Sequence, residues 1–244
     1  MKKLPLIPTL ITVFFVILML NLGFWQLRRA EQKIHLLELL SNDNITQISD
    51  KSQLIKLPKY ANITLRGHFL TAPQLLLDNQ VNNGKQGYHV FTPFMIDKLN
   101  TFIMVNRGWL SKASLSTTKL TLDTTSVTIG GKLNSTPQVG IQLGEIVLDK
   151  NKTQQIITYY DDEKISHFLH AALCKDLNCV VSAKILWLNK DYPNAFNRNW
   201  NPIVMLPSKH VGYAVQWFAM SFVLVLVFVY WLRKQNKLNE KFNA

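Results

Sequence analysis

The sequence predicts a membrane protein of the α+β class, in which two transmembrane helices flank a mostly antiparallel β domain that could close into a barrel. Two observations carry this prediction. Long apolar runs without a charged residue lie near both ends of the chain, and short strand-like segments fill the region between them. The composition agrees, because 48% of the 244 residues are hydrophobic and only 17% are charged, against about a quarter in soluble domains.

The first apolar run, Leu4–Leu27, predicts transmembrane helix 1. At about 1.5 Å per residue it is long enough for a hydrocarbon core of about 30 Å, and Phe24 and Trp25 supply interfacial aromatic side chains. A cleaved signal peptide is the alternative, since Lys2 and Lys3 precede the run. The run exceeds the usual apolar region of such a peptide and no small-residue cleavage site follows, so we favour an uncleaved anchor.

The second apolar run, Val211–Leu232, predicts transmembrane helix 2. Its aromatic residues near the ends include Tyr213, Trp217 and Trp231. A buried core helix is the alternative. The length of the run and the basic tail of residues 233–244 favour a membrane span.

Two spans place both termini on the same side of a membrane. The positive charges that flank the spans are nearly equal on the two sides, and loops longer than about 60 residues largely escape the positive-inside rule. We expect both termini in the cytoplasm and residues 28–209 on the exported, periplasmic side. No Arg- and Ser-rich presequence stands before the first run, which favours the inner (cytoplasmic) membrane of a bacterium.

The exported segment, residues 28–209, is long enough for one domain with its own core. The first span is expected to continue as an amphipathic helix over Trp25–Leu40, and Asp161–Leu173 reads as a second helix with acids in its first turn. Strand signals dominate the rest, bounded by Gly, Pro, Asn or Asp. The expected strands are Ala61–Phe69, Gln74–Asn79, Tyr88–Ile96, Thr101–Leu110, Thr124–Leu133, Gln138–Leu148, Gln154–Tyr160 and Val181–Leu188.

The net positive charge is compatible with a nucleic-acid partner, but the distribution of the cations argues against one. The net charge is +12, but the cations are scattered, without zinc-finger spacing or a basic helix. We therefore expect no nucleic acid and attribute the basicity to the lipid bilayer surface. No nucleophile elbow, phosphate loop or HExxH pattern occurs, so we expect no enzyme.

Two local pairs of side chains could carry chemistry but are weak signals. His167 and His170 stand at i, i+3 on the expected helix and could chelate a metal, although a solvated pair is the favoured interpretation. Cys174 and Cys179 could form a disulfide in an exported domain if the helix ends between them. A copper-binding pair is the other possibility for these cysteines, without further support.

His210 differs from the other histidines because it stands where the second span begins. On a helix, His210, Tyr213 and Trp217 share one face, and an ionisable residue at a membrane boundary is a functional candidate. Its imidazole could ligate a haem iron between the aromatic rings, with Arg198 and Lys209 pairing with the propionates. The plainer alternative is an interfacial histidine bonded to a lipid head group or a loop carbonyl.

Several short pieces, weak singly and specific together, resemble the surfeit locus protein 1 family of cytochrome c oxidase assembly factors. They follow the family's order over nearly the whole chain, and two spans with a large exported loop match its layout. The pieces are Leu22–Arg29 with Lys33, Arg66–Phe69, Asn79, Gly87–Pro93, Val105–Trp109, Asn199–Pro202, Met205, Pro207 and Lys209–Phe218.

The resemblance implies a chaperone-like role in assembling the respiratory haem–copper oxidase, complex IV, when haem a is placed in its catalytic subunit. The expected partners are that subunit, other assembly factors and haem a as a transient cofactor. Bacterial members are linked to haem a through a histidine at the start of the second span, a position that His210 matches. The site prediction is therefore His210 as iron ligand, with Tyr213, Trp217, Arg198 and Lys209 around the haem.

Two other interpretations stay open beside haem delivery. The protein could be a cofactor-free scaffold that stabilises an oxidase assembly intermediate, or a membrane-tethered enzyme whose site the sequence does not reveal. In the assembly interpretation, Gly87–Pro93 and Asn106–Trp109 are candidates for docking the oxidase or holding the domain against the membrane. Arg66 and Arg107 could equally be structural, pairing with carbonyls at strand ends.

Overall fold

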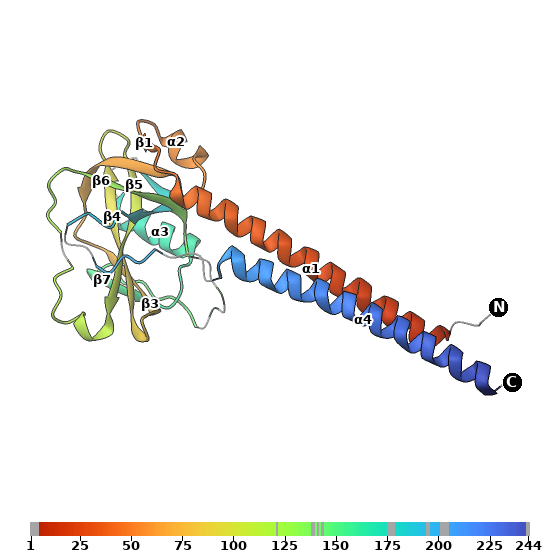
Figure 1. Ribbon diagram of the computed structural model, residues 1–244. Helices are drawn as coiled ribbons and strands as arrows, with labels where there is room; N and C mark the ends of the chain where they lie inside the picture. The colour runs from red at the N-terminus through yellow and green to blue at the C-terminus, as the bar shows by residue number, and fades with distance from the viewer. Residues whose placement is uncertain are drawn as a thin grey trace. The chain divides into compact units, whose positions relative to one another are not determined.

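The computed structural model describes residues 5–120, 122–137, 140, 142, 144–174, 179–193, 196–200 and 205–242, with side chains as far as Leu238 (Figure 1). The chain divides into two units. A helical unit comprises the two ends of the chain, and a β unit comprises Leu39–Trp200. Each unit is described by itself below.

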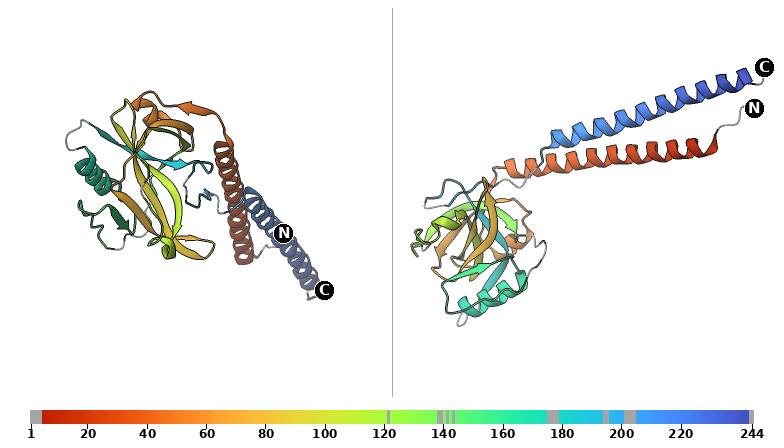
Figure 2. Two further views of the ribbon diagram at one scale, coloured as in Figure 1. Left: turned by 90° about the vertical axis from the view of Figure 1, so that its left-hand side faces the viewer. Right: turned by 90° about the horizontal axis from the view of Figure 1, so that it is seen from below.

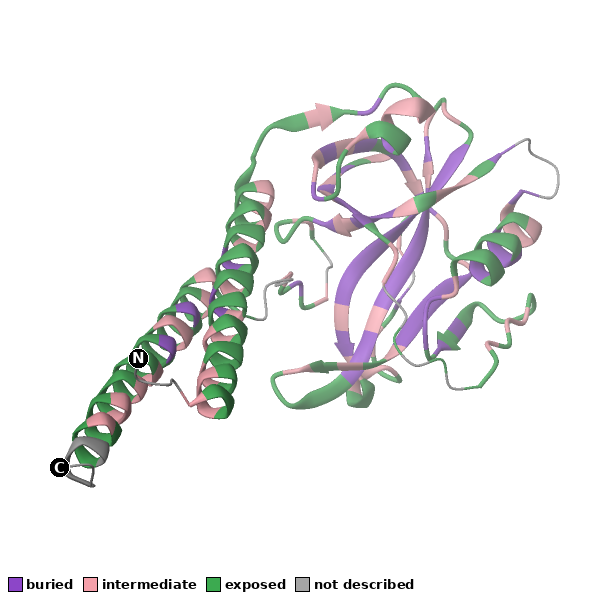
Figure 3. Cartoon of the chain, turned by 90° about the vertical axis from the view of Figure 1, so that its right-hand side faces the viewer, coloured by how far each residue is buried: buried purple, intermediate pink, exposed green. Residues whose placement is uncertain are grey.

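The helical unit consists of α1 (Leu6–Ser41) and α4 (Pro207–Phe242). Both are long and apolar enough to cross a membrane, and their most apolar stretches are almost entirely uncovered by protein, as the exposed colouring of both helices shows (Figure 3). As expected, α1 continues beyond its apolar run through the amphipathic segment. Pro207 begins α4, which suits a residue that lacks an N–H and has a fixed φ.

Contacts between the two helices run along a seam with heptad spacing. The less exposed residues recur every three or four positions in both helices, and this period of 3.5 is that of a left-handed helix pair. The ring of Phe218 lies directly over Gly23, where a Cβ would meet it at 2.4 Å. The seam residues include Thr9, Thr12, Val16, Met19, Gly23, Gln26 and Ala30 in α1, and His210, Ala214, Trp217, Ser221, Leu224 and Phe228 in α4.

The β unit is built on an eight-stranded sheet that closes into a barrel (Figure 2). The order β2–β6–β8–β5–β4 returns to its start because β4 also pairs with β2. Around this ring only β5 and β8 pair in parallel, so the expectation of a mostly antiparallel barrel is confirmed. The strands are β1 (Ile45–Gln47), β2 (Asn62–Phe69), β3 (Gln74–Asn82), β4 (Lys85–Ile96), β5 (Thr101–Ser111), β6 (Val127–Ser135), β7 (Gln154–Ile157) and β8 (Val180–Leu188).

Two main apolar clusters form the core of the β unit. The first collects the alternating inward side chains of the barrel strands, such as Ile63, Phe94 and Leu133, each with no exposed surface. The second lies under α3 (Asp162–Leu173), which buries Ile165, Phe168 and Leu169 at i, i+3 and i+4. The side chain of Asp161 caps this helix by accepting from the Lys164 N–H at 3.0 Å.

Some local predictions were wrong. Gln138–Leu148 was expected as a strand, but none of its described residues is in a strand; residues 138, 139, 141 and 143 lie outside the description. Ile146 and Leu148 instead pack on the second core cluster from an irregular segment. Their spacing of two residues therefore resembles that of a strand, although this segment forms no strand pairing. The expected strand at Gln154–Tyr160 ends at Ile157, where its pairing with β3 stops.

The structure also contains short elements that the sequence patterns did not predict. These are β1, the helix α2 (Lys51–Lys56) and a 3₁₀ turn η1 (Lys112–Ser114). A capping box starts α2, since Asp50 accepts from the Ser52 N–H at 3.2 Å and Gln53 reaches back to the Asp50 N–H. An element of one or two turns lacks the length over which periodicity can be recognised.

The two cysteines are joined. Cys174, just after α3, forms a disulfide with Cys179, just before β8, with a Cα–Cα distance of 5.6 Å. Both residues are buried beside Phe102. This pairing is the disulfide that the sequence allowed, and it leaves no free cysteine in the chain.

Candidate functional site

The predicted ligand His210 lies in the first turn of α4, in the seam that faces α1. Its Nδ1 lies 2.8 Å from Oε1 of Gln26 in α1. An amide oxygen only accepts, so Nδ1 carries the proton and donates it to Gln26. In this tautomer the free lone pair is on Nε2.

The second ring nitrogen of His210, Nε2, differs from Nδ1 in its surroundings. Nε2 is enclosed, and among the described residues no hydrogen-bonding group reaches it. A buried polar atom is normally paired, and an exception calls for an explanation. An imidazole held by an acceptor at Nδ1, with Nε2 free, has the arrangement of a histidine that ligates a metal.

The other predicted residues of α4 lie close to His210 in sequence but differ in exposure. Trp217 follows His210 in the seam and is half-buried, whereas Tyr213 is 43% exposed beside it. The side chain of Lys209 is exposed in the first turn. Since α4 turns about 100° per residue, His210 and Trp217 lie two turns apart on one side of the helix.

Arg198, predicted as a propionate partner, is a buried residue of the β unit. Its guanidinium donates to the carbonyls of Asn189, Lys190 and Tyr192, at 2.7 Å for Lys190. Burial lowers the pKa of Arg198, and the charge of Asp191 partly offsets that effect. The side chain thus holds a loop after β8 through three acceptors.

Gln26 is a site residue for which the sequence patterns gave no role. It belongs to the piece Leu22–Arg29, but an amide near the end of an apolar run reads as an ordinary interfacial side chain. A topological signal was available. In a chain with two membrane spans, the end of the first span and the start of the second lie on the same side, which would place Gln26 and His210 at similar depth.

In the β unit, the pieces Gly87–Pro93 and Val105–Trp109 lie in adjacent strands and share a hydrogen-bonded pair. Nδ2 of Asn106 lies 3.0 Å from Nδ1 of His89, while Oδ1 of Asn106 accepts from the Gly108 N–H at 3.1 Å. Since Gly108 fixes the amide, Asn106 donates to His89 and the proton of the imidazole sits on Nε2. Burial lowers the pKa of His89 to about 4, so the ring stays neutral at physiological pH.

Arg107 has a structural role, which was the alternative to a docking role for this residue. Its side chain is 2% exposed, and one guanidinium nitrogen donates to the carbonyl of Leu120 at 2.5 Å and to the Thr92 hydroxyl at 3.4 Å. The guanidinium lies 4.7 Å from the ring centre of Phe196. Burial lowers the pKa of Arg107 to about 10, which leaves it charged at pH 7.

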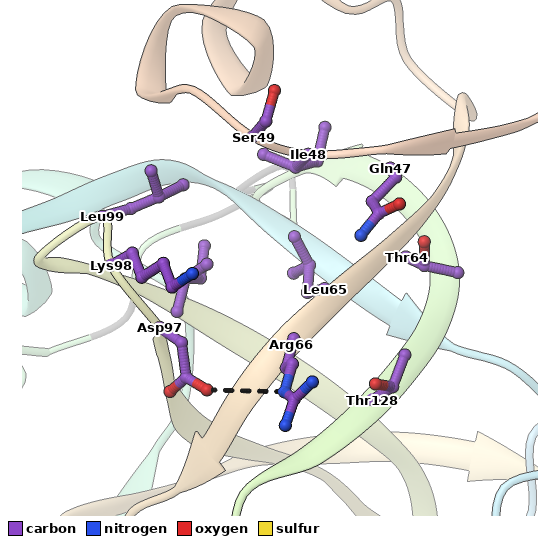
Figure 4. A pocket seen from close by; sticks show the side chains of 11 residues that line it. Gln47, Ile48, Ser49, Thr64, Leu65, Arg66, Asp97, Lys98, Leu99 and Thr128 are labelled. Carbon is purple, nitrogen blue, oxygen red and sulfur yellow. Dashed lines mark ion pairs between the residues drawn. The ribbon is translucent and has the colours of Figure 1, made fainter.

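Arg66 behaves differently from Arg107. It is exposed and lies 4.0 Å from the carboxylate of Asp97, at a pocket of about 610 Å³ between β1, β2 and the β4–β5 turn (Figure 4). Ser126 donates to the same carboxylate at 2.9 Å. The partner of Arg66 is thus a side chain rather than a strand-end carbonyl, and an exposed pair of this kind adds little stability.

The histidine pair of α3 lies at the surface of the β unit. His167 and His170 are both exposed. Across the described residues, no group of three or more His, Cys, Asp or Glu side chains could hold a metal ion. The solvated interpretation fits this placement.

Known proteins resemble this chain over most of its length. Residues 13–222 match the SURF1 family. A SURF1-like protein of Rickettsia bellii is 25% identical over 234 residues, covering 89% of this chain and 87% of the relative. The Saccharomyces cerevisiae cytochrome oxidase assembly protein SHY1 is 30% identical over 106 residues, covering 39% of this chain and 26% of the relative. Surfeit locus protein 1 of Gallus gallus is 30% identical over 113 residues, covering 38% and 36% respectively. The family match spans the helical unit and the β unit alike, and the chain belongs to the SURF1 family.

Proposed function

We propose that this protein is a cytochrome c oxidase assembly factor that holds haem a at His210 before the haem enters the catalytic subunit. One observation carries the haem part of the proposal, namely the unpartnered Nε2 of an imidazole whose Nδ1 is bonded to Gln26. The assembly part rests on family membership and on the relative that is named a cytochrome oxidase assembly protein.

The residues around His210 fit a haem that is carried as cargo. Haem a is an apolar, poorly soluble group whose iron takes imidazole nitrogen as an axial ligand. The imidazole provides that nitrogen, and Trp217 and Tyr213 provide aromatic surface on the same helix. Because Nε2 is enclosed, binding requires the surrounding side chains to move, which suits an affinity modest enough for release to the oxidase. Lys209, next to His210 in α4, is the proposed cationic partner of the propionates.

The proposed location is the inner membrane of a bacterium, with both termini in the cytoplasm and residues 28–209 in the periplasm. The disulfide Cys174–Cys179 supports the exported side, because disulfides persist in oxidising compartments. Residues 4–27 and 211–232 are the proposed spans and residues 233–244 the cytoplasmic tail. Alkaline phosphatase fused after Ala244 should be inactive and green fluorescent protein at that point fluorescent, and the reverse result would contradict this orientation.

We propose no catalytic activity for the protein. Its proposed partners are the oxidase catalytic subunit, other assembly factors, haem a and the lipid bilayer, with no nucleic acid. A scaffold that binds no haem is the competing function, and it makes a different prediction for the purified protein.

The test of haem binding is the absorption spectrum of protein purified in detergent from a host that makes haem a. The wild-type protein should carry haem a, and His210→Ala should lose at least nine-tenths of it, because the substitution removes the imidazole proposed as the axial ligand. His170→Ala removes an exposed histidine of α3 and should keep the wild-type content. A colourless wild-type protein, or full haem content in His210→Ala, would favour the scaffold.

A further inference from the structure

The hydrogen bond between Gln26 and His210 joins the two helices at one point of their seam. Gln26 stands three residues after Gly23, over which Phe218 packs, so both contacts lie on one face of α1. In α4, Phe218 and His210 are eight residues apart and lie on one face as well. Both contacts therefore belong to the same seam. In the helix register that places Phe218 over Gly23, Gln26 lies opposite His210.

From this geometry we propose that Gln26 is a positioning residue, which fixes the tautomer and ring orientation of His210 so that Nε2 offers its lone pair to the haem iron. The inference rests on the proposed haem function and names a second residue of that site. A histidine with its proton on Nε2 could not ligate through that atom. The acceptor at Nδ1 favours the tautomer with its proton on Nδ1, so Nε2 is free to ligate.

Gln26 also acts on the electron density of the ligand. A hydrogen bond accepted from Nδ1–H makes the imidazole more basic at Nε2, so the ring would hold a haem iron more firmly and favour its ferric form. A neutral amide gives a moderate effect. A carboxylate at the same place would accept a stronger, charge-assisted hydrogen bond and increase it.

The amide could instead serve only to join the helices. A polar residue in an apolar seam can specify register without any effect on a ligand. Stability alone does not separate the two roles, whereas the midpoint potential of the bound iron does. The test therefore needs a readout that only the positioning role changes.

The experiment titrates haemin into full-length protein in detergent and measures the dissociation constant and the midpoint potential. Gln26→Leu should weaken binding about 10–100-fold and raise the potential. Gln26→Glu should retain binding and lower the potential below that of the wild type. Asn21→Leu is the matched control, since Asn21 is another amide of α1 that bonds the Ile17 carbonyl of its own helix at 2.8 Å, and it should change neither quantity.

The outcomes separate the two proposals. If the wild-type protein binds no haemin, or if His210→Ala binds as well as the wild type, the proposed function fails and this inference with it. If His210→Ala loses binding but Gln26→Leu keeps the wild-type affinity and potential, only the positioning role is overturned. Circular dichroism of each variant shows whether helix content is unchanged, and a Gln26→Leu protein with intact helices and weakened binding supports the proposal.

Discussion

Gly67→Ala is expected to destabilise the β unit by about 3 kcal/mol or more, because it places a methyl group where the barrel closes. Up to Gly67, β2 pairs with β6; from Gly67 onward it pairs with β4. A Cβ at this position would lie 1.9 Å from the carbonyl oxygen of Met95 and 2.8 Å from Cε1 of Phe94. The nearest atom belongs to the backbone, so no side-chain rotation relieves the clash.

The matched control is Gly130→Ala, in β6 of the same barrel. The tight contact of a Cβ there is with the side-chain nitrogen of Asn189 at 2.9 Å, and that flexible end can move. Its effect should stay within about 1 kcal/mol, since alanine also reduces the conformational freedom of the unfolded chain. Thermal unfolding of the full chain in detergent, followed through near-ultraviolet circular dichroism, compares the two. Equal midpoints for both variants would contradict the role given to Gly67.

The strands were largely predictable from the sequence, because they are short segments rich in β-branched and aromatic residues and are bounded by Gly, Pro, Asn or Asp. Thr101–Leu110 and Val181–Leu188 agree with β5 and β8 to within one residue at each end. Their parallel pairing was not predictable, since it joins segments far apart in sequence through backbone groups that every residue carries. The pairing of β2 with β4, which closes the barrel, also depends on backbone contacts. Gly67 is the residue in the sequence that reflects this close approach.

The seam between the helices could not be read from hydrophobicity. A helix surrounded by lipid is apolar on its outer face as well. An apolar pattern therefore does not distinguish the face that contacts the other helix from the face that contacts lipid. The seam is marked instead by small residues, such as Gly23, Ala30 and Ala214, all of which are buried. The sequence therefore indicated His210 through its place at a span boundary, whereas Gln26 was identified from the packing of the two helices.

The largest expected effect in the β unit comes from reversing a buried charge. Arg107→Glu should destabilise the protein by more than about 4 kcal/mol, so that little folded protein is recovered. The carboxylate would face the carbonyl of Leu120 and the hydroxyl of Thr92, in a site that is 2% exposed. A carbonyl oxygen cannot donate, so the hydrogen bond to Leu120 would become a repulsive contact, and the donor that the Thr92 hydroxyl offers does not offset the cost of burying a negative charge.

Arg107→Met separates the loss of the hydrogen bonds from the buried charge. Methionine has a similar shape and leaves no charge, while Gln74 still donates to the carbonyl of Leu120 at 3.0 Å. The acceptor that Arg107 leaves behind is thus partly satisfied, and the expected cost is about 1–3 kcal/mol. Yield and thermal midpoint of the full chain in detergent should rank wild type above Arg107→Met and Arg107→Glu lowest.

The same ranking decides between two roles for the piece Val105–Trp109. If Arg107 were a docking contact for the oxidase, its charge reversal would leave a folded protein that fails only in oxidase assembly. The structure gives the opposite expectation, because the guanidinium lies inside the β unit and connects β5 to Leu120 in the segment that follows η1. A soluble, cooperatively unfolding Arg107→Glu protein with lost oxidase assembly would therefore assign this arginine to the partner surface and overturn its structural role.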